Sequence, residues 1–121
     1  MNHHTPDTQR LAFEAFQTLQ QTHYTAYARA HLGPRDADHA VRDTFTAILA
    51  AWRDIITDPA PAQRAWEHLR THVHRHSPRT DRDDIRTLAA LGYNTQATAA
   101  LTGLCPGKVR FLERPAGFGT P

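Results

Sequence analysis

Apolar residues recur at helical spacing along almost the whole chain, and proline or glycine interrupts the pattern between successive runs. This spacing is typical of amphipathic helices, whereas the strict alternation that is typical of half-buried strands is absent. The clearest stripe lies between Gly33-Pro34 and Asp58-Pro59 and is sustained for about five turns. Its members are Ala37, Val41, Thr44, Phe45, Ile48, Trp52 and Ile55. The sequence therefore predicts an all-α protein.

The proline and glycine breaks divide the chain into two groups of helices. Helices are expected over about residues 7–32, 37–56, 62–76, 83–91, 96–102 and 106–114. The first three can enclose one core as a small antiparallel bundle. We therefore expect a helical bundle over residues 1–76, a short linker over 77–82, a helix-turn-helix unit over 83–114 and a flexible tail over 115–121.

The inward faces of the other two bundle helices follow from the same spacing. In the first helix the stripe reads Ala12, Phe16, Leu19, His23, Tyr27 and Ala30, widened by Phe13 and Tyr24. In the third helix the inward residues are Ala62, Ala65, Trp66, Leu69 and Val73. Together with the stripe of the second helix, these residues are the predicted core.

Several classes of protein are excluded by what the chain lacks. A single cysteine leaves no internal disulfide and too few thiols for a zinc ribbon. The chain holds no apolar run of about 20 residues, and its first residues are too polar for a signal peptide. A glycine-rich phosphate loop, a nucleophile elbow and paired catalytic carboxylates are also missing, since Asp81, Asp83 and Asp84 read as favourable partners of a helix N-terminus. We therefore expect a cytoplasmic protein that is not an enzyme and needs no cofactor.

The segment from Thr95 to Leu112 has the spacing of a helix-turn-helix. Such a motif needs a small residue where the helices meet, a turn residue that accepts positive φ, and an apolar residue that holds the second helix. Ala99, Gly103 and Val109 supply these, with Leu104 and Leu112 completing the core. The predicted DNA-binding residues are Thr95, Gln96, Lys108, Arg110, Phe111 and Arg114. The alternative is a helical hairpin that packs on the bundle and leaves its cations solvated.

Charge composition permits nucleic-acid binding without requiring it. The 14 basic residues exceed the 12 acidic ones by a formal net charge of +2. Lys108 is the only lysine, so arginine supplies nearly all of the fixed positive charge. This preference reflects either GC-rich coding or the use of arginine for phosphate recognition.

The first half of the chain resembles the opening of the extracytoplasmic-function sigma factors. The segment FEAFQTLQQTHYTAYARAHLG is followed by DADHAVRDTFTAILAAW, which match the family patterns F-x-x-L/F…H…A-R…LG and D-A-x-x-x-V-x-(D/E)-x-F-x-x-x-x-x-W. The matching residues are Phe13, Phe16, His23, Ala28, Leu32, Gly33, Asp36, Ala37, Val41, Asp43, Phe45 and Trp52. The later segment LGYNTQATAALTGLCPGKVRFLER resembles the helix-turn-helix that these factors place on the upstream promoter element. The resemblance covers about residues 11–76 and 83–114.

The resemblance implies a sigma-region-2-like bundle, a shortened region-4-like unit and a role in transcription regulation. In these factors the outer face of the second helix docks on RNA polymerase core. Arg42, Asp43 and Arg53 lie off the apolar stripe and are the predicted contacts to polymerase or to another transcription protein. A solvated charged face is the alternative.

The chain also departs from the family pattern. The third helix carries HLRTHVHRHSPR in place of the Ile-Ala-Arg-Asn and Asp-x-x-Arg-Arg patterns associated with promoter melting. The linker spans at most about 20 Å, much less than the separation of two promoter elements. The alternative function is therefore a degenerate sigma-like module that binds a protein partner without promoter recognition. The oligomeric state is left open.

The histidine cluster on the third helix offers a further interpretation. His68, His72 and His76 recur at every fourth position and are weak candidates for Zn²⁺ or Ni²⁺ ligands. A pH-sensitive basic surface and ordinary structural histidines are the alternatives. Cys105, just before the last helix, is expected to be either a small buried turn residue or a redox switch.

Overall fold

The computed structural model describes residues 6–75 and 80–114, with side chains from Thr8 onward. Within these ranges the structure contains helices and no strand, which confirms the all-α class. The helices are α1 (Pro6–Arg29), α2 (Pro34–Ala50), α3 (Trp52–Ile56), α4 (Pro61–Val73), α5 (Asp81–Ala90), α6 (Thr95–Thr102) and α7 (Pro106–Glu113). The predicted tail, 115–121, lies outside the described residues. None of the described helices combines the length and apolar content that a bilayer crossing requires.

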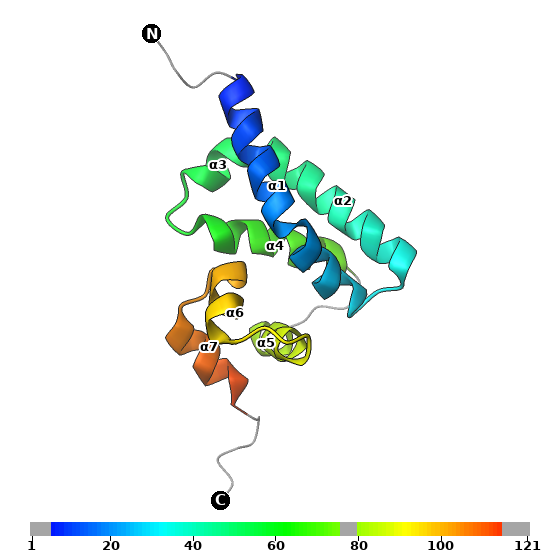
Figure 1. The fold of residues 1–121 in the computed structure, drawn as a ribbon, viewed down its shortest axis with the longest axis vertical. Coiled ribbons are helices and arrows are strands. Elements are labelled where there is room, and N and C mark those ends of the chain that lie inside the picture. The colour runs from blue at the N-terminus through cyan, green and yellow to red at the C-terminus, as the bar shows by residue number, and fades with distance from the viewer. Residues whose placement is uncertain (1–5, 76–79, 115–121) are drawn as a thin grey trace, which may run out of the picture.

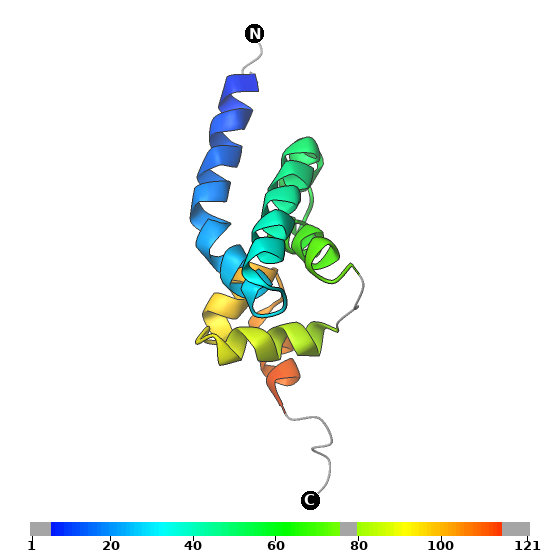
Figure 2. The ribbon, with the colours of Figure 1, turned by 90° about the vertical axis from the view of Figure 1, so that its right-hand side faces the viewer.

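The helices form a bundle with three shorter helices at one end. Figures 1 and 2 show α1 and α2 running antiparallel, with α4 lying across the bundle between α2 and the C-terminal helices. The short helices α5, α6 and α7 gather at the end of the molecule opposite the N-terminus of α1. Helix α4 contacts both α2 and α6, so it packs against the bundle on one side and against the C-terminal helices on the other.

The predicted stripe of the second helix is buried in full, but the helix itself is interrupted. Helix α2 begins at Pro34, whose missing N–H costs little in the first turn. It ends at Ala50, and α3 begins at Trp52. The single helix predicted over 37–56 was therefore wrong at Ala51, where φ of −103° and ψ of 16° leave the helical range. The apolar face continues across the break, since Trp52 and Ile55 of α3 are buried in the core like the stripe residues of α2.

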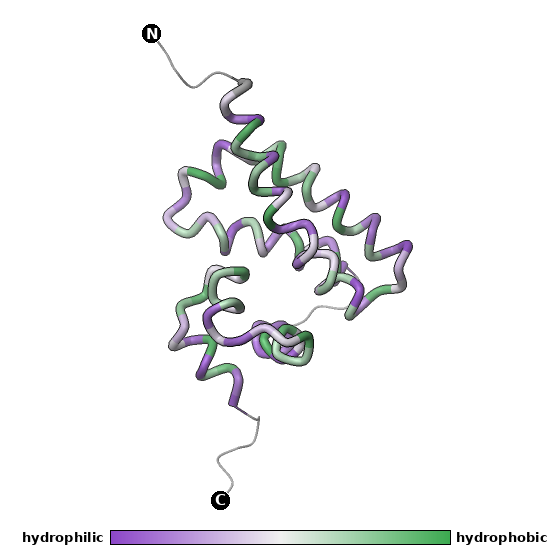
Figure 3. Tube along the Cα trace, viewed as in Figure 1, coloured by the Kyte–Doolittle hydropathy of each residue, from purple (hydrophilic) through white to green (hydrophobic). Residues whose placement is uncertain are grey.

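The predicted face of α1 was partly wrong. Leu19 is 65% exposed, and Ala12 and Ala30 are also exposed. Of the residues predicted to face inward, Phe13, Tyr24 and Tyr27 are buried and Phe16 is partly buried, and Ala28, which was not predicted, is buried beside them. Figure 3 shows apolar and polar positions interleaved along this helix. The buried rings pack edge-on against those of the neighbouring helices, Phe13 against Phe45 and Trp52, and Tyr24 against Trp66.

The C-terminal helices contribute to two clusters of buried side chains. Leu88 of α5 and Leu101 of α6 belong to the main core with the bundle residues. A smaller cluster inside the C-terminal group consists of Ile85, Ala99, Val109 and Leu112, with Leu104 packed against it. These helices are therefore held to the bundle and also to one another.

The segment predicted as a linker is partly helical. Residues 76–79 lie outside the described ranges, but Asp81 and Arg82 form the first turn of α5. Thr80 is the N-cap of this helix and accepts a hydrogen bond from the Asp83 backbone N–H, while the Asp83 carboxylate accepts one from the Thr80 N–H. This capping box fixes the start of α5 two residues before the predicted position.

Candidate nucleic-acid interface

Helices α6 and α7 are joined as the spacing predicted. Gly103 has φ of 81° and ends α6, and Pro106 stands in the first turn of α7. Ala99 is 9% exposed where the two helices meet, and Val109 is fully buried. Asn94 is the N-cap of α6 and its side chain accepts from the Ala97 backbone N–H at 2.8 Å, so α6 begins at Thr95, one residue before its predicted start.

Burial of one side of α7 orients its polar side outward. With Val109 and Leu112 in the small core, the side chains of Lys108, Arg110 and Phe111 are exposed. Figures 1 and 2 place α7 at the end of the molecule away from α1 and α2, so the bundle does not cover this side. We call the exposed set Lys108, Arg110, Phe111 and Arg114 the α7 face.

The two candidates at the start of α6 differ in their surroundings. Gln96 is exposed. Thr95 is partly buried, and its hydroxyl donates to the Glu113 carboxylate at 3.2 Å. The carboxylate therefore lies near the N-terminus of α6, where negative charge is favourable. Of the two residues, Gln96 is the one whose side chain is exposed to solvent.

Arg82 supports the α7 face and was not among the predicted site residues. Its guanidinium donates to the backbone carbonyl of Leu112 at 3.0 Å and also to that of Arg114. The same guanidinium lies 5.9 Å from the centroid of the Phe111 ring. Arg82 therefore occupies carbonyl groups at the end of α7 and places its positive charge beside the aromatic ring. The sequence placed this residue in the linker, so local spacing carried no signal for it.

The predicted partner-binding residues all lie at the surface but line different hollows. Arg42 lines a groove of about 620 Å³ between α1 and α2. Asp43 lines a second hollow of about 520 Å³ beside the end of α4. Arg53 of α3 lines a third of about 280 Å³. The structure therefore distributes these residues along α2 and α3 without gathering them in one pocket.

The histidines of α4 make local contacts. The Nδ1 atom of His72 donates to the backbone carbonyl of His68 at 2.8 Å. Burial, reinforced by the nearby His72 and Arg64, lowers the pKa of His68, which favours its neutral form. His76 lies outside the described residues. Among the residues that are described, no three histidine, cysteine or acidic side chains are arranged to hold a metal ion. Cys105 is exposed, so the expectation of a buried turn residue was wrong.

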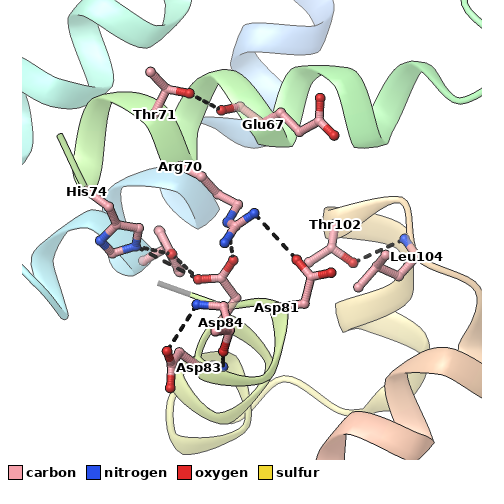
Figure 4. A network of polar contacts seen from close by, with 11 residues as sticks. Glu67, Arg70, Thr71, His74, Asp81, Asp83, Asp84, Thr102 and Leu104 are labelled. Carbon is pink, nitrogen blue, oxygen red and sulfur yellow. Dashed lines mark hydrogen bonds and ion pairs between the residues drawn. The ribbon is translucent and has the colours of Figure 1, made fainter. Parts of the chain in front are cut away.

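A buried polar network joins the C-terminal helices to the bundle. Figure 4 shows Arg70 of α4 pointing toward Asp81 and Asp84 of α5, with His74 on the other side of Asp84. The Nε atom of Arg70 lies 2.6 Å from an Asp84 carboxylate oxygen, and another guanidinium nitrogen lies 3.4 Å from Asp81. The Tyr27 hydroxyl donates to Asp84 and lies 2.5 Å from the Nε2 atom of His74. Three helices therefore meet at one buried carboxylate.

This network was missed by sequence reasoning. Asp84 was interpreted as a favourable charge at a helix N-terminus, which describes its place in the first turn of α5. Its side chain is nevertheless buried, and its hydroxyl partner Tyr27 is 57 residues away in the sequence. No local pattern connects residues so far apart.

Burial raises the pKa of Asp84 above its ordinary value of 3.8, although Tyr27 and Arg70 oppose the shift. A carboxyl group whose pKa is higher in the folded state binds a proton on folding, so its contribution to stability is lost as pH rises through the folded-state pKa. We expect the unfolding free energy of the wild type, relative to Asp84→Asn, to fall as pH rises above about 4. Urea unfolding at a series of pH values measures this difference, with Asp81→Asn as the exposed control. A difference that grows with pH would contradict the assignment.

Comparison of the chain with protein-family models, curated proteins and solved structures found no match. The function is therefore inferred from the residues and geometry of the chain itself.

Proposed function

We propose that this protein is a sigma-factor-like transcription regulator that binds duplex DNA through α6 and α7. The observation that carries the proposal is the α7 face: a helix held by Val109 and Leu112 presents Lys108, Arg110 and Arg114 to solvent beside a tight turn at Gly103. An α-helix with this division of faces fits the major groove of B-form DNA.

The cations of the α7 face have different proposed tasks. Arg110 lies on the exposed side of the second turn and is suited to a bidentate contact with a guanine edge. Lys108 in the first turn and Arg114 at the C-terminus are suited to phosphate contacts on either side. Gln96, exposed at the start of α6, offers a neutral hydrogen-bonding group.

Replacing Arg110 with alanine tests this proposal. If Arg110 reads a base, its loss is expected to weaken binding to the preferred duplex by about 1–3 kcal/mol and to relax sequence preference at one position. The probe is a duplex enriched by the wild-type protein from a random-sequence pool, and the readout is fluorescence anisotropy at fixed salt concentration.

The matched control is Arg35→Ala, which removes an exposed arginine from the start of α2. This variant has the same net charge as Arg110→Ala and should bind within about twofold of the wild type, because it lies away from α7. Equal losses in the two variants would show that binding depends on overall charge alone. Failure of the wild type to enrich any duplex would contradict the DNA-binding function itself.

We further propose that α2 and α3 present the surface for RNA polymerase core or another transcription protein. Arg42, Asp43 and Arg53 are exposed there, and Asp43 carries the only negative charge of the three. Retention of the wild type on polymerase core, and its loss in Asp43→Arg, supports this contact. Retention unchanged by that substitution removes Asp43 from the interface.

A second candidate function is a protein-interaction module without promoter recognition. The packing of Leu88 and Leu101 into the bundle core favours it, because a unit held in this way cannot reach a distant promoter element while the contact persists. The salt dependence of binding separates the two functions. DNA binding weakens steeply as salt rises because counterions are released, whereas a largely apolar protein contact weakens much less.

A further inference from the structure

Phe111 is the exposed aromatic residue of the α7 face. Its side chain is 57% exposed, whereas Phe13 and Phe45 are 5% and 3% exposed in the core. A single exposed apolar residue needs no special explanation by itself. Phe111 differs because the Arg82 guanidinium lies over its ring and is itself bonded to carbonyl groups at the end of α7. The ring therefore has a cationic neighbour that is itself bonded to α7, although more than half of Phe111 faces solvent.

The neighbours of Phe111 indicate what it can meet. Lys108 stands three residues before it in α7, on the same side of the helix. Arg114 follows three residues after it as the C-cap, just beyond the last helical turn, so a cation lies near the ring in each direction along the chain. If both cations contact phosphates, the ring between them points into the groove. The apolar group that B-form DNA displays in its major groove is the C5-methyl group of thymine.

We propose that Phe111 contacts the C5-methyl group of a thymine in the major groove, and that Arg82 is the positioning residue that holds the ring for this contact. The inference rests on the proposed DNA-binding function and specifies part of its recognition sequence. Binding sites should therefore contain a thymine next to the base that Arg110 reads.

Deoxyuridine substitution tests the contact one methyl group at a time. Each thymine of the enriched duplex is replaced in turn by deoxyuridine, which keeps base pairing and removes only the methyl group. At one position the wild-type affinity should fall about fourfold, as expected for the loss of one buried methyl group. Phe111→Ala should bind the original duplex more weakly and should no longer distinguish thymine from deoxyuridine at that position.

Arg82→Ala separates positioning from folding. Loss of positioning reduces the ratio of affinities for the thymine and deoxyuridine duplexes, whereas simple destabilisation of α7 weakens both complexes equally and leaves the ratio unchanged. Arg86→Ala, an exposed arginine on the same helix, is the control and should keep the wild-type ratio. Arg82→Lys should restore part of the ratio, because an ammonium group can also lie over the ring.

The outcomes distinguish this inference from the proposed function. Wild-type binding that is equal for every deoxyuridine duplex overturns the thymine contact and leaves DNA binding intact. A ratio that persists in Phe111→Ala assigns the methyl contact to another residue and also overturns it. Equal or tighter binding of the single strand also overturns the thymine contact, because that contact requires the major groove of a duplex. Failure of the wild type to bind any duplex overturns both proposals.

Discussion

Replacement of Gly103 with alanine is expected to destabilise the protein by about 2–5 kcal/mol. The residue has φ of +81°, a conformation that costs an L-residue about 1–2 kcal/mol. In addition, a Cβ atom at this position would lie 2.3 Å from the backbone nitrogen of Gln63 in α4. Because backbone atoms cannot move aside cheaply, this overlap adds about 1–3 kcal/mol. Urea unfolding at neutral pH measures the sum.

Gly92 provides a matched control for this prediction. It also has positive φ, +98°, but an added Cβ would meet no atom within 4 Å. Gly92→Ala should therefore show the backbone strain alone, about 1–2 kcal/mol. The difference between the two variants isolates the close approach of the α6–α7 turn to α4. Equal losses in the two alanine variants would mean that this turn does not pack on α4 in solution.

Asp84→Ala is expected to cost about 3 kcal/mol at neutral pH, at the lower end of the range for breaking a buried ion pair. The substitution removes the acceptor of the buried Tyr27 hydroxyl and the closest ion-pair partner of Arg70. The cost stays at the lower end because the Arg70 side chain is 25% exposed and keeps Asp81 at 3.4 Å. Chemical denaturation followed by tryptophan fluorescence measures it, since Trp66 lies close to Tyr27.

Asp81→Ala tests whether burial causes the effect. Asp81 stands in the same helical turn as Asp84 and pairs with the same arginine, but its side chain is 44% exposed. Exposed ion pairs contribute about 0–1 kcal/mol. A loss in Asp81→Ala as large as that in Asp84→Ala would show that the two carboxylates are equally solvated, contrary to the structure.

The sequence predicted best where a single periodic pattern was sufficient. Every residue of the stripe from Ala37 to Ile55 is buried, because α2 offers one apolar face and has a proline to mark its start. The turn at Gly103 was also predicted from the sequence, since glycine adopts positive φ far more readily than other residues. The exposed positions of α7 followed from the burial of Val109 and Leu112.

The errors arise where tertiary packing selects among local alternatives. Leu19 and Tyr27 belong to the same predicted stripe, yet Leu19 is exposed, whereas Tyr27 is buried against Trp66 and Tyr24 stacks on Phe45. The helix break at Ala51 could not be predicted, because neither proline nor glycine stands at that point in the sequence. Arg82 could not be recognised because its acceptors at Leu112 and Arg114 are 30 and 32 residues away.

The position of α4 between α2 and α6 has a consequence for how the molecule unfolds. Its residues Trp66 and Leu69 belong to the same core cluster as Leu88 and Leu101 of the C-terminal helices. Neither the bundle nor the C-terminal helices can therefore separate from α4 without exposing apolar surface of α4 to water. Unfolding of α4 and detachment of either neighbouring group of helices are therefore energetically coupled. Backbone amides in the central turns of α4 should consequently exchange with solvent only through global unfolding, which makes the two groups one cooperative unit.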